Sequence, residues 1–207
     1  MSERISVFTV DDHPLMREGL ANLISTQPDM KLIGQASTGR QAIQEIRKQN
    51  IDVIIMDLRL PDMSGVDAMN AIHAEFPNVR FIIFTTFGYE NDIRHALAEG
   101  AQAYILKTMP PSELMDVVRQ VHAGKKWIAA QVAAQLAEHF SDEPLSCREV
   151  EVLRQLAHGS RNRDIADKLF IAEETVKVHL KHIFGKLGAN DRTQALTIAL
   201  RRGLVQL

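Results

Sequence analysis

The stretch Ile51–Gly65, which reads IDVIIMDLRLPDMSG, is an apolar run that ends at Asp57 and leads directly into a loop. A nearly continuous apolar run is typical of a parallel strand that is buried on both faces. The start of the chain repeats this pattern, because Ile5–Val10 runs straight into Asp11 and Asp12. Two buried strands are therefore predicted to deliver three carboxylates to their C-terminal ends. Carboxylates gathered there repel one another unless a cation or a chemical modification makes use of them.

Apolar runs of this kind alternate with amphipathic helical segments up to about residue 123. The predicted strands are Ile5–Val10, Lys31–Ala36, Ile51–Asp57, Arg80–Thr86 and Ala103–Lys107. The predicted helices are Leu15–Ser25, Arg40–Gln49, Val66–Phe76, Asn91–Glu99 and Ser112–His122. This alternation predicts an α/β fold, a flavodoxin-like doubly wound parallel sheet of five strands. In sheets with the strand order 2-1-3-4-5, ligands lie beyond the C-terminal strand ends, where the order reverses.

The rest of the chain is predicted to form a linker and a helical domain. We expect the α/β domain to span residues 1–123, the linker residues 124–144 and the C-terminal domain residues 145–207. Within the linker, the Ala- and Gln-rich segment Ile128–Phe140 is predicted to be helical. The C-terminal domain starts with Ser146-Cys147-Arg148-Glu149, which has the form of a capping box. Four helices follow in the pattern, and the tight connection between two short ones indicates a helix-turn-helix.

The composition excludes several classes of protein. A chain of 207 residues that is 45% hydrophobic and 24% charged is typical of one or two globular domains. It contains no apolar run of about 18 residues, so no membrane insertion is expected. The N-terminus lacks the apolar stretch and cleavage site of a signal peptide. The single cysteine, Cys147, cannot form an internal disulfide, which fits a reducing cytoplasm.

Polar side chains also end the fourth and fifth predicted strands, at Thr85 and Lys107. Carboxylates such as Asp11, Asp12 and Asp57 suit Mg²⁺, a hard cation that prefers oxygen ligands. If Asp57 accepts a phosphoryl group, the metal and Lys107 offset its negative charge, and the Thr85 hydroxyl donates a hydrogen bond to a phosphoryl oxygen. Each residue alone has an ordinary structural explanation. Their convergence at one edge of a sheet favours a functional site.

The last third of the chain is a candidate for nucleic-acid contact. Residues 1–143 contain 13 Lys and Arg against 19 Asp and Glu, whereas residues 144–207 contain 11 against 7. The third helix of this basic part carries Lys177 and Lys181, which share a face because they are four residues apart. The opposite face carries Ile171, Val176, Leu180, Ile183 and Leu187. Such a helix suits the major groove of double-stranded DNA, although two lysines alone would also fit a solvated face of a helical bundle.

Residues 4–123 resemble a response-regulator receiver domain. The matching residues are Asp11, Asp12, Asp57, Pro61, Gly65, Thr85, Tyr104 and Lys107. The resemblance implies that Asp57 is phosphorylated by a sensor histidine kinase. It also implies that Asp12, the Asp57 side chain and the backbone carbonyl of Arg59 bind Mg²⁺, with Asp11 acting through water. No other enzyme activity is expected beyond this phosphorylation and dephosphorylation of Asp57.

The same resemblance implies that Thr85 and Tyr104 form a switch pair, in which Thr85 moves toward the phosphoryl group and Tyr104 turns inward behind it. The sequence alone instead favours a partly buried Tyr104 with its hydroxyl in water. Two departures are present: Thr108 follows Lys107 where many receivers have proline, and the large, charged Arg59 stands two residues after Asp57. Arg59 is in a position to alter the attack of water on the phosphoryl group, with no direction implied.

Residues 145–207 resemble the LuxR-type domain of NarL/FixJ-family regulators. The matching segments are Leu145–Glu149, Asn162–Ala166, Thr175–His179, Ile183, Lys186–Leu187 and Asp191–Ala195. This resemblance implies DNA contacts from Lys177, Val178 and Lys181, and we add Thr175 and His179 as neighbours on the same helix. It further implies a homodimer formed through the last helix, on DNA or upon phosphorylation, with RNA polymerase as an additional candidate partner. Ala172 stands where a Ser or Thr cap is usual.

The sequence therefore predicts a cytoplasmic two-component response regulator that controls transcription. One alternative keeps the fold but places the receiver under the control of a ligand or partner. A second is an aspartyl-phosphate hydrolase of the haloacid-dehalogenase type, which needs a second Asp where this chain has Arg59. A third is a flavodoxin-like cofactor binder, which is disfavoured because no Ser/Thr/Gly-rich loop follows the first strand.

Overall fold

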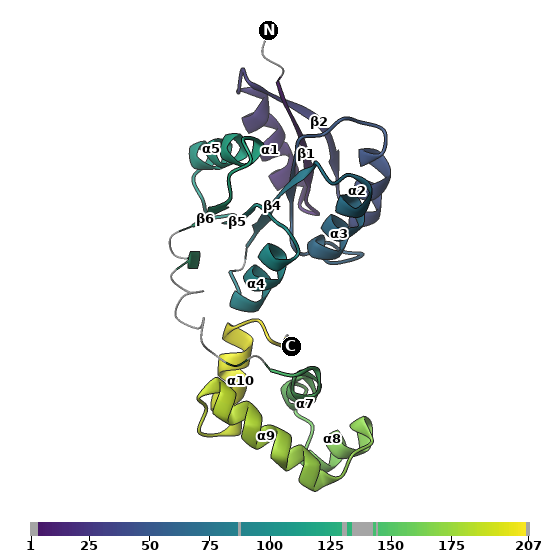
Figure 1. Cartoon of the computed structure of the whole chain (residues 1–207), viewed down its shortest axis with the longest axis vertical. Coiled ribbons are helices and arrows are strands. Elements are labelled where there is room, and N and C mark those ends of the chain that lie inside the picture. Colours follow the sequence, from purple (N-terminus) through teal and green to yellow (C-terminus); the bar gives the residue numbers. More distant parts are fainter. Residues whose placement is uncertain (1–3, 87, 130–131, 134–142, 144, 206–207) are drawn as a thin grey trace. The chain divides into compact units, whose positions relative to one another are not determined.

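The computed structural model describes residues 4–86, 88–129, 132–133, 143 and 145–205 (Figure 1). The chain forms two compact units, the first built on a parallel sheet and the second on helices. The strands are β1 (Ile5–Val10), β2 (Met30–Ala36), β3 (Val53–Met56), β4 (Arg80–Thr85), β5 (Ala103–Leu106) and β6 (Trp127–Ile128). The helices that alternate with them are α1 (Pro14–Ser25), α2 (Gly39–Ile46), α3 (Gly65–Glu75), α4 (Glu90–Ala98) and α5 (Pro111–His122).

The sheet has the order β2-β1-β3-β4-β5-β6, and every pair of neighbours is parallel. This confirms the doubly wound fold and the order 2-1-3-4-5 of the five predicted strands. The reversal of the order places β1 beside β3, with Val10 paired with Met56. Asp11 and Asp57, which directly follow these two residues, therefore leave the sheet side by side.

A sixth strand corrects the prediction of five. Trp127 and Ile128 pair with Ala103 and Tyr104 of β5, and the Trp127 amide donates to the Gln102 carbonyl at 2.9 Å. The predicted helix Ile128–Phe140 is thus wrong at Ile128, and most of its remaining residues lie outside the described ones. The two residues of β6 are too few to show a period in the sequence, and it is the exposed edge of β5 that makes them a strand.

Alternating strand residues build the core of the first unit. On one face of the sheet, the side chains Val7, Val53 and Ile55 pack in one buried cluster with residues of α1 and α5. Figure 1 shows α1 and α5 on one side of the sheet and α2 and α3 on the other. The strand residues of opposite parity, among them Ile54 and Tyr104, are also fully buried. Burial on both faces explains the nearly continuous apolar runs.

The second unit contains the helices α7 (Cys147–Ala157), α8 (Asn162–Leu169), α9 (Glu173–Leu187) and α10 (Arg192–Arg201). The predicted capping box at the start of α7 is present, because the Ser146 hydroxyl accepts from the Glu149 amide and the Glu149 carboxylate accepts from the Ser146 amide. Ala172 is the N-cap residue of α9 and, as expected for alanine, gives the helix no side-chain cap. One buried cluster joins all four helices.

Candidate functional site: an acidic pocket and a basic helix

Asp11 and Asp57 occupy the C-terminal edge of the sheet as the strand register requires. The Asp57 amide donates to the carbonyl of Val10 at 2.7 Å, and the Asp11 amide donates to the carbonyl of Ala36 at 3.1 Å. Both residues are buried: Asp57 has 5% of its surface exposed and Asp11 has 1%. Asp12, the next residue, is exposed. The edge therefore holds two buried carboxylates and one that faces solvent.

Lys107 bridges the two buried carboxylates. Its ammonium lies 2.7 Å from Oδ2 of Asp11 and 2.6 Å from Oδ2 of Asp57. Burial disfavours the charged ammonium and is the largest single influence on it, but the two carboxylates together outweigh burial and raise the pKa of Lys107. Burial raises the pKa of Asp57 above its ordinary value, against the opposing effect of Lys107 and the Arg59 amide. The lysine thus compensates charge that the buried edge would otherwise disfavour.

The loop after Asp57 is shaped by close backbone packing. The Gly65 amide donates to the Leu58 carbonyl at 2.7 Å, and a β-carbon added to Gly65 would lie 2.1 Å from the Asp57 carbonyl oxygen. The Arg59 amide donates to Oδ1 of Asp57 at 3.2 Å, while the Arg59 side chain is exposed. No contact tests its backbone carbonyl as a metal ligand, so that role stays a prediction.

Thr85 and Tyr104 lie in neighbouring strands near this edge. The Thr85 side chain is buried, and its carbonyl accepts the Lys107 amide at 2.7 Å. Tyr104 is fully buried, with 0% of its surface exposed. The sequence alone favoured a half-exposed ring, and that expectation is wrong because Tyr104 lies in β5 between two strands, paired with Ile83 on one side and Ile128 on the other.

The donor atoms at this edge fit a divalent cation. One ligand atom from each of Asp11, Asp12, His13 and Asp57 lies within 4.8 Å of all the others. The three carboxylates match the oxygen-rich surroundings that Mg²⁺ prefers. The sequence analysis missed His13, although its position directly after Asp12 was a signal for it. Asp11, Asp12 and Asp57 are the residues that would hold Mg²⁺ here.

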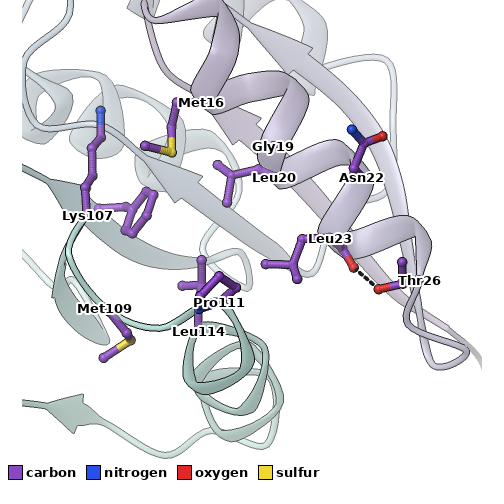
Figure 2. A pocket seen from close by; sticks show the side chains of 11 residues that line it. Met16, Gly19, Leu20, Asn22, Leu23, Thr26, Lys107, Met109, Pro111 and Leu114 are labelled. Atoms are coloured by element: carbon purple, nitrogen blue, oxygen red, sulfur yellow. Dashed lines mark hydrogen bonds between the residues drawn. The ribbon is translucent and has the colours of Figure 1, made fainter.

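A cavity of about 450 Å³ lies next to the acidic pocket, between α1 and the segment that leads from β5 into α5. It is lined by Met16, Gly19, Leu20, Asn22, Leu23, Thr26, Phe84, Lys107, Met109, Pro111 and Leu114. Figure 2 shows the apolar side chains of Met16, Leu20 and Leu23 of α1 facing those around Met109 and Leu114. On the same helix, Leu15 has 84% of its surface exposed. The surface beside the acidic pocket is therefore apolar.

The predicted DNA-binding residues lie on α9 and face solvent. Thr175, Lys177, Val178 and Lys181 are exposed, and His179 is half-buried. The predicted apolar stripe lies on the opposite side, since Val176, Leu180, Ile183 and Leu187 are buried and Ile171 packs against them. Lys177 lies 2.7 Å from Glu174 of its own helix, and this hydrogen bond raises the pKa of Lys177. A basic, accessible helix face is thus available for an anionic partner.

Two family descriptions match the chain. The response regulator receiver domain matches residues 7–119, and the luxR family of bacterial regulatory proteins matches residues 143–199. The chain belongs to the NarL/FixJ family of response regulators. As a response regulator it joins a receiver domain to a LuxR-type DNA-binding domain, and it is a DNA-binding regulator of transcription in a two-component system.

Relatives match this response regulator over nearly its whole length. It is 39% identical to the uncharacterized transcriptional regulatory protein YxjL of Bacillus subtilis, over 99% of both chains. It is 33% identical to the response regulator protein VraR of Staphylococcus saprophyticus, over 98% of this chain and 99% of that one.

Solved structures of response regulators are also similar. The response regulator ChrA of a heme-sensing two-component system is 37% identical, with a TM-score of 0.58, and the match covers 99% of this chain and 100% of ChrA. RcsB of Salmonella enterica, solved bound to a promoter with a phosphomimetic, is 25% identical with a TM-score of 0.75, and the match covers 96% and 99% of the two chains. None of the helices in the described part of the response regulator is long and apolar enough to cross a membrane.

Proposed function

We propose that this response regulator is controlled by transfer of a phosphoryl group from a sensor histidine kinase to Asp57. A carboxylate oxygen of Asp57 attacks the phosphorus of the phosphohistidine. The N–P bond breaks, the kinase imidazole keeps the bonding electron pair, and Asp57 becomes an acyl phosphate. Mg²⁺ held by Asp11, Asp12 and Asp57 would offset repulsion between the incoming phosphoryl oxygens and the carboxylates.

One observation carries the proposal: the Lys107 ammonium lies between the two buried carboxylates, Asp11 and Asp57. A buried carboxylate with a lysine beside it can gain negative charge at lower cost than an isolated one. Phosphorylation adds about 1.5 to 2 negative charges, and Lys107 is the cation placed to compensate them. The buried Thr85 hydroxyl is the donor proposed to bind a phosphoryl oxygen, with Tyr104 following its movement.

The output of this chemistry is proposed to be DNA binding by α9. Lys177, Val178 and Lys181 would contact bases or phosphates in the major groove, with Thr175 and His179 beside them. RcsB, similar over nearly its whole chain, has been solved as dimers bound to DNA, which supports a homodimer that reads two half-sites. Phosphorylation would release the DNA-binding domain and favour this dimer, and RNA polymerase is the proposed recipient of the signal.

The first experiment measures phosphorylation directly. Full-length protein is incubated with a small phosphodonor and Mg²⁺, and its intact mass is followed. We expect one phosphoryl addition in the wild type and none in Asp57→Ala, whereas Asp52→Ala, in the turn before β3, should still be modified. Gel-shift titrations of the phosphorylated wild type and of Asp57→Ala then test DNA binding. Equal DNA affinity and stoichiometry with and without phosphorylation would contradict the proposed switch.

Two further assays on the same proteins separate this proposal from a ligand-controlled receiver and from an aspartyl-phosphate hydrolase. A receiver controlled by a ligand or partner would show no mass increase with any phosphodonor. An aspartyl-phosphate hydrolase would release inorganic phosphate from a generic phosphate ester over many turnovers. Arg59 stands two residues after Asp57, where a haloacid-dehalogenase phosphatase needs its second aspartate, so we expect no such turnover.

A further inference from the structure

The peptide between Asp11 and Asp12 is held by a side chain from α1. The guanidinium of Arg17 donates through Nη1 to the carbonyl oxygen of Asp11 at 2.6 Å. Arg17 is half-buried, and its side chain reaches back six residues to the turn that precedes its own helix. A charged donor makes a stronger hydrogen bond than a neutral one. Arg17 therefore fixes the backbone at the point where the chain leaves β1 for the acidic pocket.

The main chain of Arg17 is tied to the sheet as well. Its carbonyl accepts a hydrogen bond from the side-chain amide of Gln35 at 2.9 Å, and the same amide donates to the Thr9 hydroxyl at 3.3 Å. Gln35 and Thr9 are partners in the register of β2 and β1, and Thr9 is fully buried. Arg17 thus joins the sheet, through its backbone, to the turn after β1, through its side chain.

Asp12 is the residue whose position depends most on this turn. Its carboxylate is exposed and contacts the adjacent His13 at 2.6 Å, whereas the carboxylate of Asp11 is buried and contacts Lys107. The place of an exposed side chain depends on the backbone that carries it, and here that backbone is the peptide held by Arg17. A metal ligand has to be held within about 0.5 Å of its working position.

We propose that Arg17 is a positioning residue for the divalent cation. It sets the orientation of the Asp11–Asp12 peptide and so keeps the carboxylate of Asp12 near that of Asp57, with one oxygen of each within 4.8 Å of the other. The inference rests on the cation site of the proposed function, in which Asp11, Asp12 and Asp57 hold Mg²⁺. Residues that orient metal ligands without touching the ion typically contribute about 10- to 100-fold in metal affinity.

A purely electrostatic role for Arg17 makes the opposite prediction. The guanidinium is a positive charge close to a cation site, so its charge by itself repels Mg²⁺. Removal of that charge alone would strengthen the binding of Mg²⁺, whereas loss of the oriented peptide weakens it. A role in stability alone would leave the Mg²⁺ affinity of the folded protein unchanged. The sign of the change in Mg²⁺ affinity therefore separates the three roles.

The experiment titrates full-length wild type and Arg17→Met with Mg²⁺ in a calorimeter. Methionine keeps an unbranched side chain but has neither the donor nor the charge. We expect the Mg²⁺ affinity to fall by about tenfold. Arg17→Lys should recover most of the loss, because the contact uses one N–H and not a bidentate fork. Lys31→Met, which removes one positive charge from an exposed residue of β2, is the control and should match the wild type.

Phosphorylation by a small phosphodonor gives a second readout. In Arg17→Met the half-maximal rate should require about tenfold more Mg²⁺, while the rate at saturating Mg²⁺ stays close to that of the wild type. Circular dichroism checks that the variant is folded. If it is not, Arg17→Gln, whose side chain is too short for the same contact, takes its place with the same expectation.

Unchanged or tighter Mg²⁺ binding in the folded variant would overturn the inference, and so would a lower phosphorylation rate that saturating Mg²⁺ does not restore. These results would leave the proposed function intact, provided that the wild type binds Mg²⁺ and is phosphorylated. Conversely, Mg²⁺ binding that depends on Arg17 in a protein whose Asp57 accepts no phosphoryl group would contradict only the proposed function.

Discussion

Gly65 packs against the backbone of Asp57 so closely that no side chain fits between them. An added β-carbon would lie 2.1 Å from the Asp57 carbonyl oxygen and 3.0 Å from its carbonyl carbon. Backbone atoms cannot move away as the end of a flexible side chain can. The position of Asp57 thus depends on the absence of a side chain at Gly65, eight residues later.

Gly65→Ala should therefore displace Asp57 and slow its phosphorylation. We expect a loss of stability of about 1–3 kcal/mol, the usual range for overpacking, and a lower rate of phosphoryl addition by intact mass. Gly19→Ala is the matched control, because an added β-carbon there meets nothing within 4 Å. In the helix α1 this control should be neutral or gain up to about 1 kcal/mol. If Gly65→Ala were as stable as the wild type and were phosphorylated at the same rate, the proposed role of this packing would be contradicted.

Lys107→Met should destabilise the first unit in a pH-dependent way. Removing the ammonium leaves Asp11 and Asp57 buried without their cation, at a cost of about 3–5 kcal/mol near neutral pH. A carboxyl whose pKa is raised on folding contributes stability below its unfolded pKa of 3.8, and this contribution is lost as pH rises through the folded value.

The deficit of Lys107→Met should accordingly be small near pH 3.8 and grow as the pH rises. Urea unfolding followed by tryptophan fluorescence measures the stability of the first unit, because Trp127, the only tryptophan of the chain, lies in β6 of that unit. Lys125→Met, at an exposed lysine of the same unit, should show no such dependence. A deficit independent of pH would mean that Lys107 acts through packing alone.

Glu149→Gln should destabilise the second unit with the opposite pH dependence. Burial disfavours the charged form of Glu149 and is the largest single influence, but the Ser146 amide and Lys186 outweigh it and lower the pKa below 4.5. The stabilisation is thus present above about pH 4.5 and lost as pH falls through the folded value. Urea unfolding followed by circular dichroism should show wild type and variant converging in acid. A constant difference would count against the charge of Glu149.

Leu15→Ser tests the apolar surface beside the acidic pocket. A kinase that delivers a phosphohistidine to Asp57 must cover the surroundings of this pocket, where Leu15 is 84% exposed. We expect phosphoryl transfer from the kinase to slow by about tenfold, the equivalent of one apolar contact of roughly 1.4 kcal/mol. Phosphorylation by a small donor should be unchanged. Slowing with both donors would indicate damage to the pocket, and slowing with neither would exclude Leu15 from the docking surface.

Lys177→Ala and Lys181→Ala test the DNA-binding face through salt dependence. A lysine that neutralises one phosphate contributes about 0.9 to the slope of log affinity against log salt concentration. We expect each substitution at a phosphate contact to reduce the slope by roughly this amount, measured by fluorescence anisotropy with duplex DNA. Lys125→Ala is the control outside the domain. Unchanged slopes in both α9 variants would place the DNA contact on another face.

The sequence predicted most of the sheet and of the pocket because both follow from strong local patterns. The apolar runs that end at Asp11 and Asp57 define β1 and β3, and the register Val10–Met56 then brings the carboxylates together. The close approach of Gly65 to Asp57 is a contact that the local sequence does not contain.

What the sequence did not predict depends on tertiary neighbours. Tyr104 is fully buried in β5, and β6, which pairs with β5 over two residues, is too short to give a periodic signal in the sequence. His13 has the sequence position of a helix cap, and only the structure shows its ring turned to the carboxylates. The exposed Phe170, with φ of 55° between α8 and α9, was likewise invisible in the periodic pattern.

The ion pair between Lys177 and Glu174 gives α9, the helix proposed to bind DNA, a carboxylate that competes with phosphate for Lys177. Any phosphate that approaches Lys177 must displace a carboxylate already in place. A random stretch of duplex offers charge alone and gains little from this exchange, whereas an operator adds base contacts that only a fitting sequence supplies. If α9 binds DNA as proposed, Glu174 would favour operators over random duplex, because each phosphate contact of Lys177 would first have to replace this ion pair.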